Sequence, residues 1–140
     1  MKKSKHTTMS ETLLSEKGFK ITPSRVAILR LLLEGKTPMT VEDIQKSLTS
    51  TINKTTIYRA LSDFVECRIL SQTDFRDGKI YYEYQDYHHH HVVCTMCGLK
   101  EEVDICIEAS IPKIKKESKQ FNEISDHMLE FFGVCMKCTS

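Results

Sequence analysis

The chain has 140 residues, and its 40% hydrophobic content is enough to build the core of one ordinary domain or of two small ones. No apolar run approaches the roughly 18 to 20 residues that cross a membrane, and the basic start, Met1 to His6, leads into polar residues instead of an apolar signal core. These features argue against a membrane protein and predict a cytoplasmic location with no membrane partner. In a reducing compartment the six cysteines are expected as thiols or metal thiolates and not as disulfides.

The net charge of +1 is unevenly distributed between the two halves of the chain. Residues 1–70 contain twelve Lys and Arg against seven Asp and Glu, a balance of +5, whereas residues 71–140 contain eight against twelve, a balance of −4. The first half therefore suits a polyanionic partner and the second half suits cations. Many solvated helical faces carry as much charge, so this asymmetry only supports other signals.

Two helices are predicted at the start of the chain. Ser10 is expected to cap a short helix over residues 11–17, which ends at Gly18. Thr22-Pro23 then supplies a cap and a proline at the first helical position, and an apolar stripe at helical spacing runs to a stop at Gly35.

Two further helices carry the first functional signal. Thr40 and Asp43 form a capping box that opens a third helix ending near Leu48. A fourth helix is predicted over residues 54–65. Its apolar face leaves the other face to basic, hydroxylated and aromatic side chains, which are Lys54, Thr55, Thr56, Tyr58 and Arg59.

The third and fourth helices permit two interpretations. In a helix-turn-helix, the start of the second helix enters the major groove, and these polar side chains contact phosphates and base edges. In a simple three-helix packing unit they are only solvated. A predicted hairpin follows, with strands at 69–75 and 80–84 and Asp77-Gly78 at the turn. Helix-turn-helix followed by a hairpin is the order of a winged helix, which favours DNA binding.

The second half begins with a histidine run, His88 to His91, followed by β-branched Val92 and Val93, which predict a strand. Side chains alternate between the two faces of a strand, so the four histidines form two pairs that can serve two metal ions. An internal run of four joined to a CxxC motif is not typical of a purification tag. A helix over 105–119, interrupted by Pro112, and a last strand over 125–134 complete a small α+β unit. Its short sheet is expected to pair with a second copy of the chain.

Two CxxC motifs predict a tetrahedral zinc site. Each motif places two thiolates across a tight turn, and together Cys94, Cys97, Cys135 and Cys138 complete a sulfur set. The gap between the motifs is longer than in a minimal zinc ribbon, so the ion is expected to clamp two separate segments. Cys67 and Cys106 remain, and they are interpreted as small buried hydrophobes, with a redox or ligand role as the alternative.

The chain resembles the ferric uptake regulator family of bacterial metal-dependent repressors over nearly its whole length. Four motifs match in order and spacing, and they are residues 22–25, 56–61, 88–98 and 135–138. The resemblance implies a winged-helix DNA-binding domain over 1–84, a hinge, and an α/β dimerisation domain over 85–140 that forms a homodimer. It also adds Arg25 to the candidate DNA contacts and implies a double-stranded DNA operator as partner.

The resemblance assigns three metal sites. The structural zinc maps onto the four cysteines of the CxxC motifs. A second-domain site maps onto His88, His90, Glu108 and His127, and an inter-domain regulatory site maps onto Glu83, His89, His91 and Glu102. Members of the family often add a histidine from the first domain, where this chain has Pro38-Met39. Either the site has fewer ligands, or His6 or another group replaces that histidine, or the second-domain site performs the sensing.

The carboxylates of the inter-domain set are hard donors that suit Fe(II) or Mn(II), whereas its imidazoles suit Zn(II) equally well. We therefore expect a repressor of metal-uptake genes that senses iron, with zinc, manganese or peroxide sensing as alternatives. A metalloenzyme is the rival from another class, but nothing in the chain builds a substrate pocket, so no catalytic residue and no enzymatic activity are predicted. A metal storage or delivery protein would not need the polar helix face or the hairpin.

Overall fold

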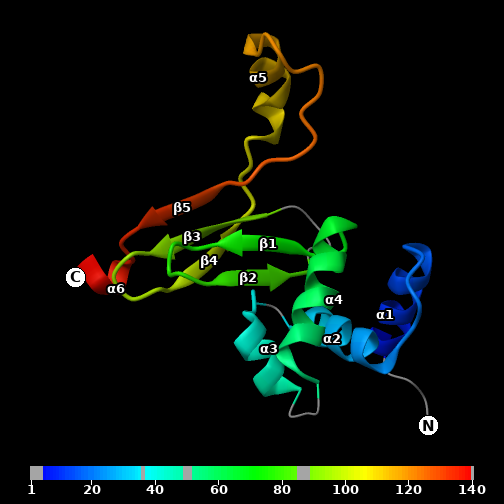
Figure 1. Cartoon of the computed structure of the whole chain (residues 1–140). Coiled ribbons are helices and arrows are strands. Elements are labelled where there is room, and N and C mark those ends of the chain that lie inside the picture. The colour runs from blue at the N-terminus through cyan, green and yellow to red at the C-terminus, as the bar shows by residue number, and fades with distance from the viewer. Residues whose placement is uncertain (1–4, 36, 49–51, 85–88, 140) are drawn as a thin grey trace. The chain divides into compact units, whose positions relative to one another are not determined.

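The computed structural model describes residues 5–35, 37–48, 52–84 and 89–139 (Figure 1). Backbone contacts divide the chain into two units, residues 1–85 and 86–140, and each is described by itself. The elements of the first unit are α1 (Lys5–Glu16), α2 (Pro23–Glu34), α3 (Val41–Ser47), α4 (Lys54–Glu66), β1 (Ser71–Asp74) and β2 (Ile80–Glu83). Those of the second unit are β3 (His90–Cys94), β4 (Lys100–Val103), η1 (Glu108–Ser110), α5 (Ile111–Glu117), β5 (Glu130–Gly133) and α6 (Met136–Thr139).

The first unit is built around α4, whose apolar face packs into the core. Ile57, Leu61 and Phe64 each have 0% exposed surface and pack with α2 and α3 residues in one hydrophobic core. Asn53 begins the helix, because its side-chain oxygen accepts the N–H of Thr56 at 2.9 Å. The buried face fixes the opposite face of α4 toward solvent.

The predicted caps of α2 and α3 are confirmed. The Thr22 hydroxyl accepts the N–H of Arg25, and Pro23 stands in the first turn of α2. At α3 the Thr40 hydroxyl accepts the N–H of Asp43 at 3.1 Å, while the Asp43 carboxylate accepts the N–H of Thr40 at 3.0 Å. Both halves of the capping box are present, so two otherwise unpaired amides are satisfied.

The prediction for α1 was wrong at its start. The helix begins at Lys5, and Ser10 lies inside it with its hydroxyl donating to the carbonyl of His6 at 2.7 Å. Ser10 is fully buried, so this intrahelical hydrogen bond satisfies it in place of a cap. The predicted end is confirmed, because Gly18 takes the left-handed conformation with φ +78° two residues after the last helical residue, Glu16.

The hairpin forms the wing. β1 pairs antiparallel with β2, with Ser71 opposite Glu83 and Asp74 opposite Ile80. The predicted strand start at Ile69 is too early, because Ile69 is buried in the helical core before β1 begins. Met39 adds a backbone bridge to Tyr82, which connects the segment before α3 to the wing. The helices and this hairpin together confirm the winged-helix prediction.

The second unit contains a three-stranded sheet in the order β4-β3-β5 (Figure 1). β3 lies in the centre, antiparallel to β4 and parallel to β5. The register sets His91 opposite Glu102 on one side and opposite Glu130 on the other. The histidine strand therefore has acidic residues on both neighbouring strands.

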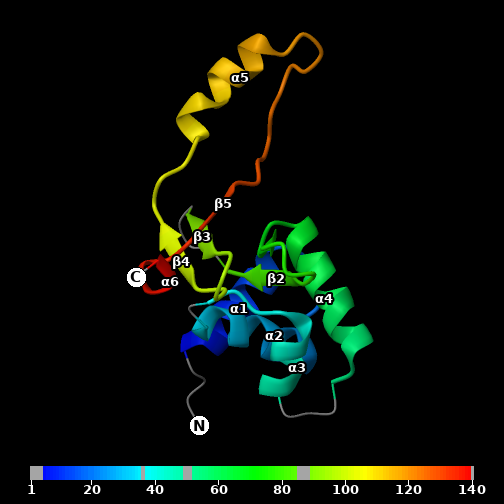
Figure 2. The same cartoon turned by 90° about the vertical axis from the view of Figure 1, so that its left-hand side faces the viewer.

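Two element boundaries in the second unit differ from the predictions. The helix expected over 105–119 is replaced by a 3-10 turn, η1, and the shorter α5, which starts where Pro112 is tolerated in the first turn. The last strand spans only Glu130–Gly133 of the expected 125–134. As a result Cys106 lies in a loop outside any helix. Both views show α5 and the segment that returns to β5 extending away from the sheet (Figure 2). No helix among the described residues is long and apolar enough to cross a bilayer.

Candidate metal centres and DNA-binding surface

The four cysteines of the CxxC motifs converge at one end of the sheet. Cys94 ends β3, Cys97 follows in a tight turn, and Cys135 and Cys138 come from the segment after β5. The sulfur of Cys94 lies 3.8 Å from that of Cys138, and the sulfur of Cys97 lies 3.7 Å from that of Cys135. A tetrahedral zinc with Zn–S bonds of about 2.3 Å separates its sulfurs by about 3.8 Å. This cluster therefore suits zinc.

Backbone groups support the sulfur of Cys94. The N–H groups of Cys135 and Cys97 donate to it at 3.3 and 3.5 Å, and they lower the pKa of Cys94 to about 6. Gly98, with φ +79°, closes the turn, and its N–H donates to the carbonyl of Cys94. Hydrogen bonds with the thiols of Cys135 and Cys97 raise the pKa of Cys138 to about 12. Four crowded sulfurs cannot all ionise without a cation, which is the property expected of a zinc site.

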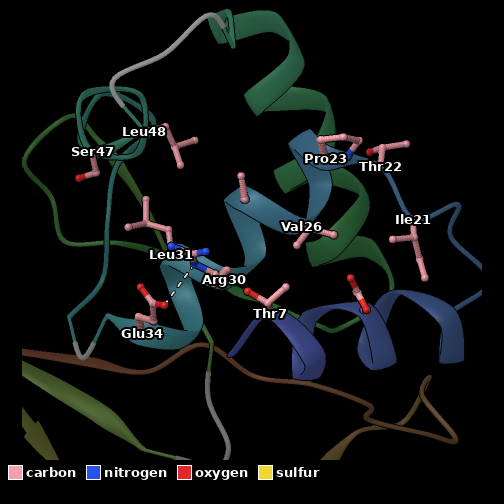
Figure 3. Close-up of a pocket in the computed structure, with 12 residues that line it drawn as sticks. Thr7, Ile21, Thr22, Pro23, Val26, Arg30, Leu31, Glu34, Ser47 and Leu48 are labelled. Carbon is pink, nitrogen blue, oxygen red and sulfur yellow. Dashed lines mark ion pairs between the residues drawn. The ribbon is translucent and has the colours of Figure 1, made fainter. Parts of the chain in front are cut away.

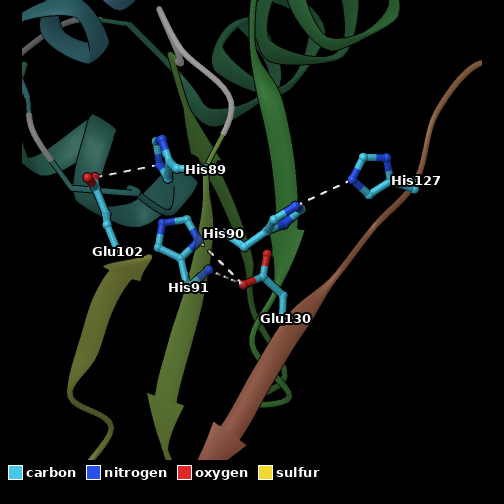
Figure 4. A network of polar contacts seen from close by, with 6 residues as sticks. All are labelled: His89, His90, His91, Glu102, His127 and Glu130. Atoms are coloured by element: carbon cyan, nitrogen blue, oxygen red, sulfur yellow. Dashed lines mark hydrogen bonds and ion pairs between the residues drawn. The ribbon is translucent and has the colours of Figure 1, made fainter. Parts of the chain in front are cut away.

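A second cluster is built around His90, the first residue of β3. His90 points toward His127 from the segment before β5 (Figure 4), with 3.3 Å between the two Nε2 atoms. The third donor atom within 4.8 Å of both is the sulfur of Cys106. Glu108, the predicted carboxylate ligand, is not part of this group within the described ranges, and its backbone N–H donates to the Cys106 sulfur at 3.2 Å. His88, the remaining predicted ligand, lies outside the described residues.

The third cluster contains His89, His91 and Glu102. Their donor atoms lie within 4.8 Å of one another, and the His89 Nε2 is 3.5 Å from a Glu102 oxygen. The two imidazole centroids are 5.0 Å apart, so the alternation predicted for the histidine strand brings these two rings together and sends His90 to the opposite face (Figure 4). Glu83, the fourth predicted donor, ends β2 in the first unit.

Glu130 is a neighbour of this cluster that was not predicted from the sequence. One of its carboxylate oxygens lies 3.4 Å from His91 Nδ1 and accepts the backbone N–H of His91 at 3.1 Å. A carboxylate on one ring nitrogen fixes the orientation and tautomer of an imidazole whose other nitrogen binds a metal. The available signal was an acidic residue inside the otherwise apolar run before Cys135, but only the β3–β5 pairing identifies its partner.

The polar face predicted for α4 is exposed, and its role in binding DNA stays a prediction. Lys54, Thr55, Tyr58 and Arg59 are exposed, Tyr58 to 49%, and Thr56 is half-buried at the capped first turn. Lys54 forms an ion pair of 3.4 Å with Glu42 on α3, which ties the two helices at their exposed side. Arg25 differs from this group, because its guanidinium donates to the carbonyl of Lys20 at 2.8 Å and lies over the ring of Phe19.

The structure also locates Met39 and His6, which mark the two regions of the first unit where a further metal ligand was sought. Met39 is engaged in the bridge to the wing. His6 lies 3.8 Å from Glu34, which also pairs with Arg30 at 3.2 Å. Arg30 and Glu34 line a pocket of about 650 Å³ between α1, α2 and the end of α3 (Figure 3). The pocket combines Ile21, Val26 and Leu48 with the ion-paired Arg30 and Glu34, which is typical of a packing gap and not of a metal centre.

A winged helix, followed in the chain by a sheet unit with a tetrathiolate cluster and two imidazole clusters, defines a class of DNA-binding proteins that respond to metal ions. Comparison with known proteins specifies the family: the chain belongs to the Ferric uptake regulator family, which it matches over residues 16–132. Members of this family are dimeric, metal-dependent transcription regulators and not enzymes. The resemblance drawn from the motifs is confirmed.

Individual relatives differ in the signal to which they respond. The chain is 31% identical over 133 residues to the ferric uptake regulation protein of Bacillus subtilis (strain 168), with 89% of each chain covered. It is 28% identical over 128 residues to the peroxide-responsive repressor PerR of Staphylococcus aureus (strain Mu50), covering 89% of this chain and 86% of the relative. The structure of the ferric uptake regulator from Pseudomonas aeruginosa with manganese superimposes with a TM-score of 0.70 at 28% identity, covering 91% of this chain and 98% of that one.

Proposed function

We propose that this protein is an iron-responsive repressor of metal-uptake genes that binds a double-stranded operator as a homodimer. The observation that carries this proposal is the cluster of His89, His91 and Glu102 in a chain whose first unit is a winged helix. Two imidazoles and a carboxylate form a ligand set of intermediate hardness, which suits Fe(II) and Mn(II) and accepts Zn(II). The similarity to a ferric uptake regulation protein favours iron among these ions.

In the proposed mechanism, Glu83 completes the regulatory site. An ion held by Glu83 together with His89 and His91 would restrict the first unit to one orientation relative to the second. Because half-sites on DNA recur about 34 to 36 Å apart, only one orientation lets both recognition helices of a dimer dock. With an ion held by these residues, the DNA-binding state would be favoured, and by linkage DNA would tighten metal binding by the same factor.

The structural zinc has a separate role in this proposal. Cys94 and Cys97 at the end of β3 and Cys135 and Cys138 after β5 would hold one zinc per chain, which fastens the C-terminal segment to the sheet. The ion supplies folding energy, because a tetrathiolate site binds it in the folded state alone. The exposed start of α4 would contact the major groove, with Tyr58 and Arg59 nearest the bases.

The test begins with duplexes enriched from a randomised DNA library by the Mn(II)-loaded protein. Affinity for one such duplex is measured without oxygen against free Fe(II), Mn(II) and Zn(II). We expect Fe(II) to tighten binding roughly 5- to 150-fold, the usual range of coupling between sites. His91→Ala and Glu83→Gln should remove this response while the cysteine zinc is retained, and His127→Ala should have a smaller effect.

Two controls separate the parts of the proposal. Arg59→Ala should lose DNA affinity without losing metal binding or thermal stability, because the side chain is exposed on α4. Lys119→Ala changes an exposed basic residue outside the proposed surface and should leave DNA affinity nearly unchanged. An unchanged Fe(II) response in His91→Ala would refute the regulatory site, and a protein that enriches no duplex with any metal would refute the repressor function.

A further inference from the structure

Three donor atoms meet on the face of β3 opposite His91. The Cys106 sulfur lies 3.1 Å from His90 Nε2 and 3.2 Å from His127 Nε2, and the two nitrogens are 3.3 Å apart. The three residues are distant in sequence and come from three segments, namely β3, the loop after β4 and the segment before β5. Figure 4 shows the two imidazoles of this group turned toward each other.

Hydrogen bonding alone explains this triangle poorly. In a neutral imidazole, each ring nitrogen is either a donor or an acceptor, and a thiol has one proton. Suppose that the Nε2–H of one ring donates to the Nε2 of the other ring. The thiol can then donate only to that accepting nitrogen, and the single N–H of the donating ring would have to serve both the other ring and the sulfur. Three contacts of nearly equal length therefore cannot all be good hydrogen bonds.

One metal ion explains all three contacts together. Zinc binds imidazole nitrogen at about 2.0 to 2.1 Å and thiolate sulfur at about 2.3 Å. In a tetrahedron these bonds separate two nitrogens by about 3.3 Å and a nitrogen from a sulfur by about 3.5 Å. The 3.3 Å between the two nitrogens matches the first value, and the sulfur–nitrogen distances of 3.1 and 3.2 Å are shorter than the second by about 0.3 to 0.4 Å.

The surroundings of Cys106 agree with a ligand role. The N–H of Glu108 donates to its sulfur at 3.2 Å, as backbone amides do for metal-bound thiolates. Cys67 offers a contrast within the same chain. Its sulfur donates to the carbonyl of Phe64 at the end of α4, and the side chain is half-buried against the apolar core, as a small hydrophobe packs.

We propose that Cys106 is a thiolate ligand of a second metal site, with His90 and His127, and that this site takes a borderline ion such as Zn(II). A His-His-Cys set is softer than the predicted set with Glu108, so it disfavours Fe(II) and Mn(II). The three described donors leave the fourth position of the tetrahedron to a further ligand. The inference rests on the proposed function only in treating the sheet unit as a metal-binding unit, and its test uses no DNA.

Co(II) is the probe, because it occupies tetrahedral zinc sites and a Co(II)–thiolate bond gives an intense near-ultraviolet charge-transfer band. The full-length protein, with zinc in its four-cysteine site, is titrated with Co(II) without oxygen. We expect the band to saturate at one added Co(II) per chain and to be absent in Cys106→Ala and Cys106→Ser. Cys67→Ala is the matched control and should keep the band.

Competition between Zn(II) and the bound Co(II) measures how much Cys106 contributes to Zn(II) affinity at this site. Loss of Cys106 should weaken Zn(II) binding at this site by more than the roughly 10- to 100-fold that loss of an outer hydrogen-bond partner costs. Zinc content and circular dichroism of Cys106→Ser verify that the fold and the four-cysteine site persist. A band that persists in Cys106→Ala, or Co(II) binding that needs Glu108 and not Cys106, would overturn the inference. Neither result depends on whether the protein represses transcription.

Discussion

The two units of this chain are stabilised in different ways. The winged-helix unit holds the continuous apolar core, in which residues such as Leu29, Ile44 and Phe64 are fully buried. In the described part of the sheet unit, the buried hydrophobic residues are Val93 and Cys94. Large apolar side chains of that unit remain exposed instead, and they include Met96, Ile105, Phe121, Met128 and Phe131.

This contrast indicates what each unit needs in order to fold. Apolar burial contributes roughly 25 cal/mol per Å² removed from water, so the first unit can offset its conformational entropy with its own core. The sheet unit has little such burial, and a short three-stranded sheet is marginal by itself. We infer that zinc at the cysteine cluster and a second copy of the chain supply the missing stability.

Removal of the zinc is the most direct test of this difference between the two units. Cys138→Ser should release about one zinc per chain and unfold the sheet unit, because binding energies on the order of 10 kcal/mol are coupled to folding in such sites. Hydrogen exchange should show loss of protection in residues 90–133 with α2 and α4 still protected. Cys67→Ser is the matched control. A zinc-free variant with a protected sheet would show that the second unit does not depend on the metal.

The complementary test changes the apolar core of the first unit instead of the zinc site of the second. Phe64→Ala deletes a fully buried ring and should destabilise the first unit by about 3 to 5 kcal/mol. Denaturant unfolding monitored by hydrogen exchange should show this loss of stability in the helices, while the zinc in the cysteine site is retained. Ile80→Ala, at a side chain 43% exposed, should cost less than about 1 kcal/mol. Equal losses for both would mean that the core is not the source of stability.

A third change tests the role of a second copy. Phe131 is 39% exposed on β5, which is an edge strand of the sheet. If a partner covers it, Phe131→Asp should weaken dimerisation by roughly 10- to 100-fold, since burying such a side chain contributes about 1.5 to 3 kcal/mol. Sedimentation at several protein concentrations measures this, with Lys119→Glu as a charge-changing control. A dimer of unchanged affinity would place the interface elsewhere.

The smallest expected effect comes from the capping box that begins α3 in the first unit. Thr40→Ala removes the hydroxyl half of the capping box and should cost about 1 kcal/mol of folding stability. Thr40→Ser keeps the hydroxyl and should recover most of it. Thermal unfolding of the two variants side by side provides the measurement. A Thr40→Ser protein as unstable as Thr40→Ala would mean that packing of the methyl group matters more than the cap.

The sequence was sufficient for features that depend on near neighbours. The capping box spans four residues, the alternation of His89, His90 and His91 follows from the two-residue period of a strand, and each CxxC turn is a local backbone geometry. The local signals failed where a competing partner was present. Ser10 has the residue type of a cap but is satisfied within α1, and Pro112 fixes a later helix start than the apolar pattern suggested.

Tertiary structure decided which donors share a site. Cys106 meets His90 from sixteen residues away and His127 from twenty-one, and Glu130 reaches His91 across thirty-nine. No periodicity links such positions, because their separation depends on strand order, register and the path of the loop after β4. A pattern within a few residues can therefore predict that a chain binds metal, whereas the set of ligands around each ion is determined only when the β4-β3-β5 sheet brings distant segments together.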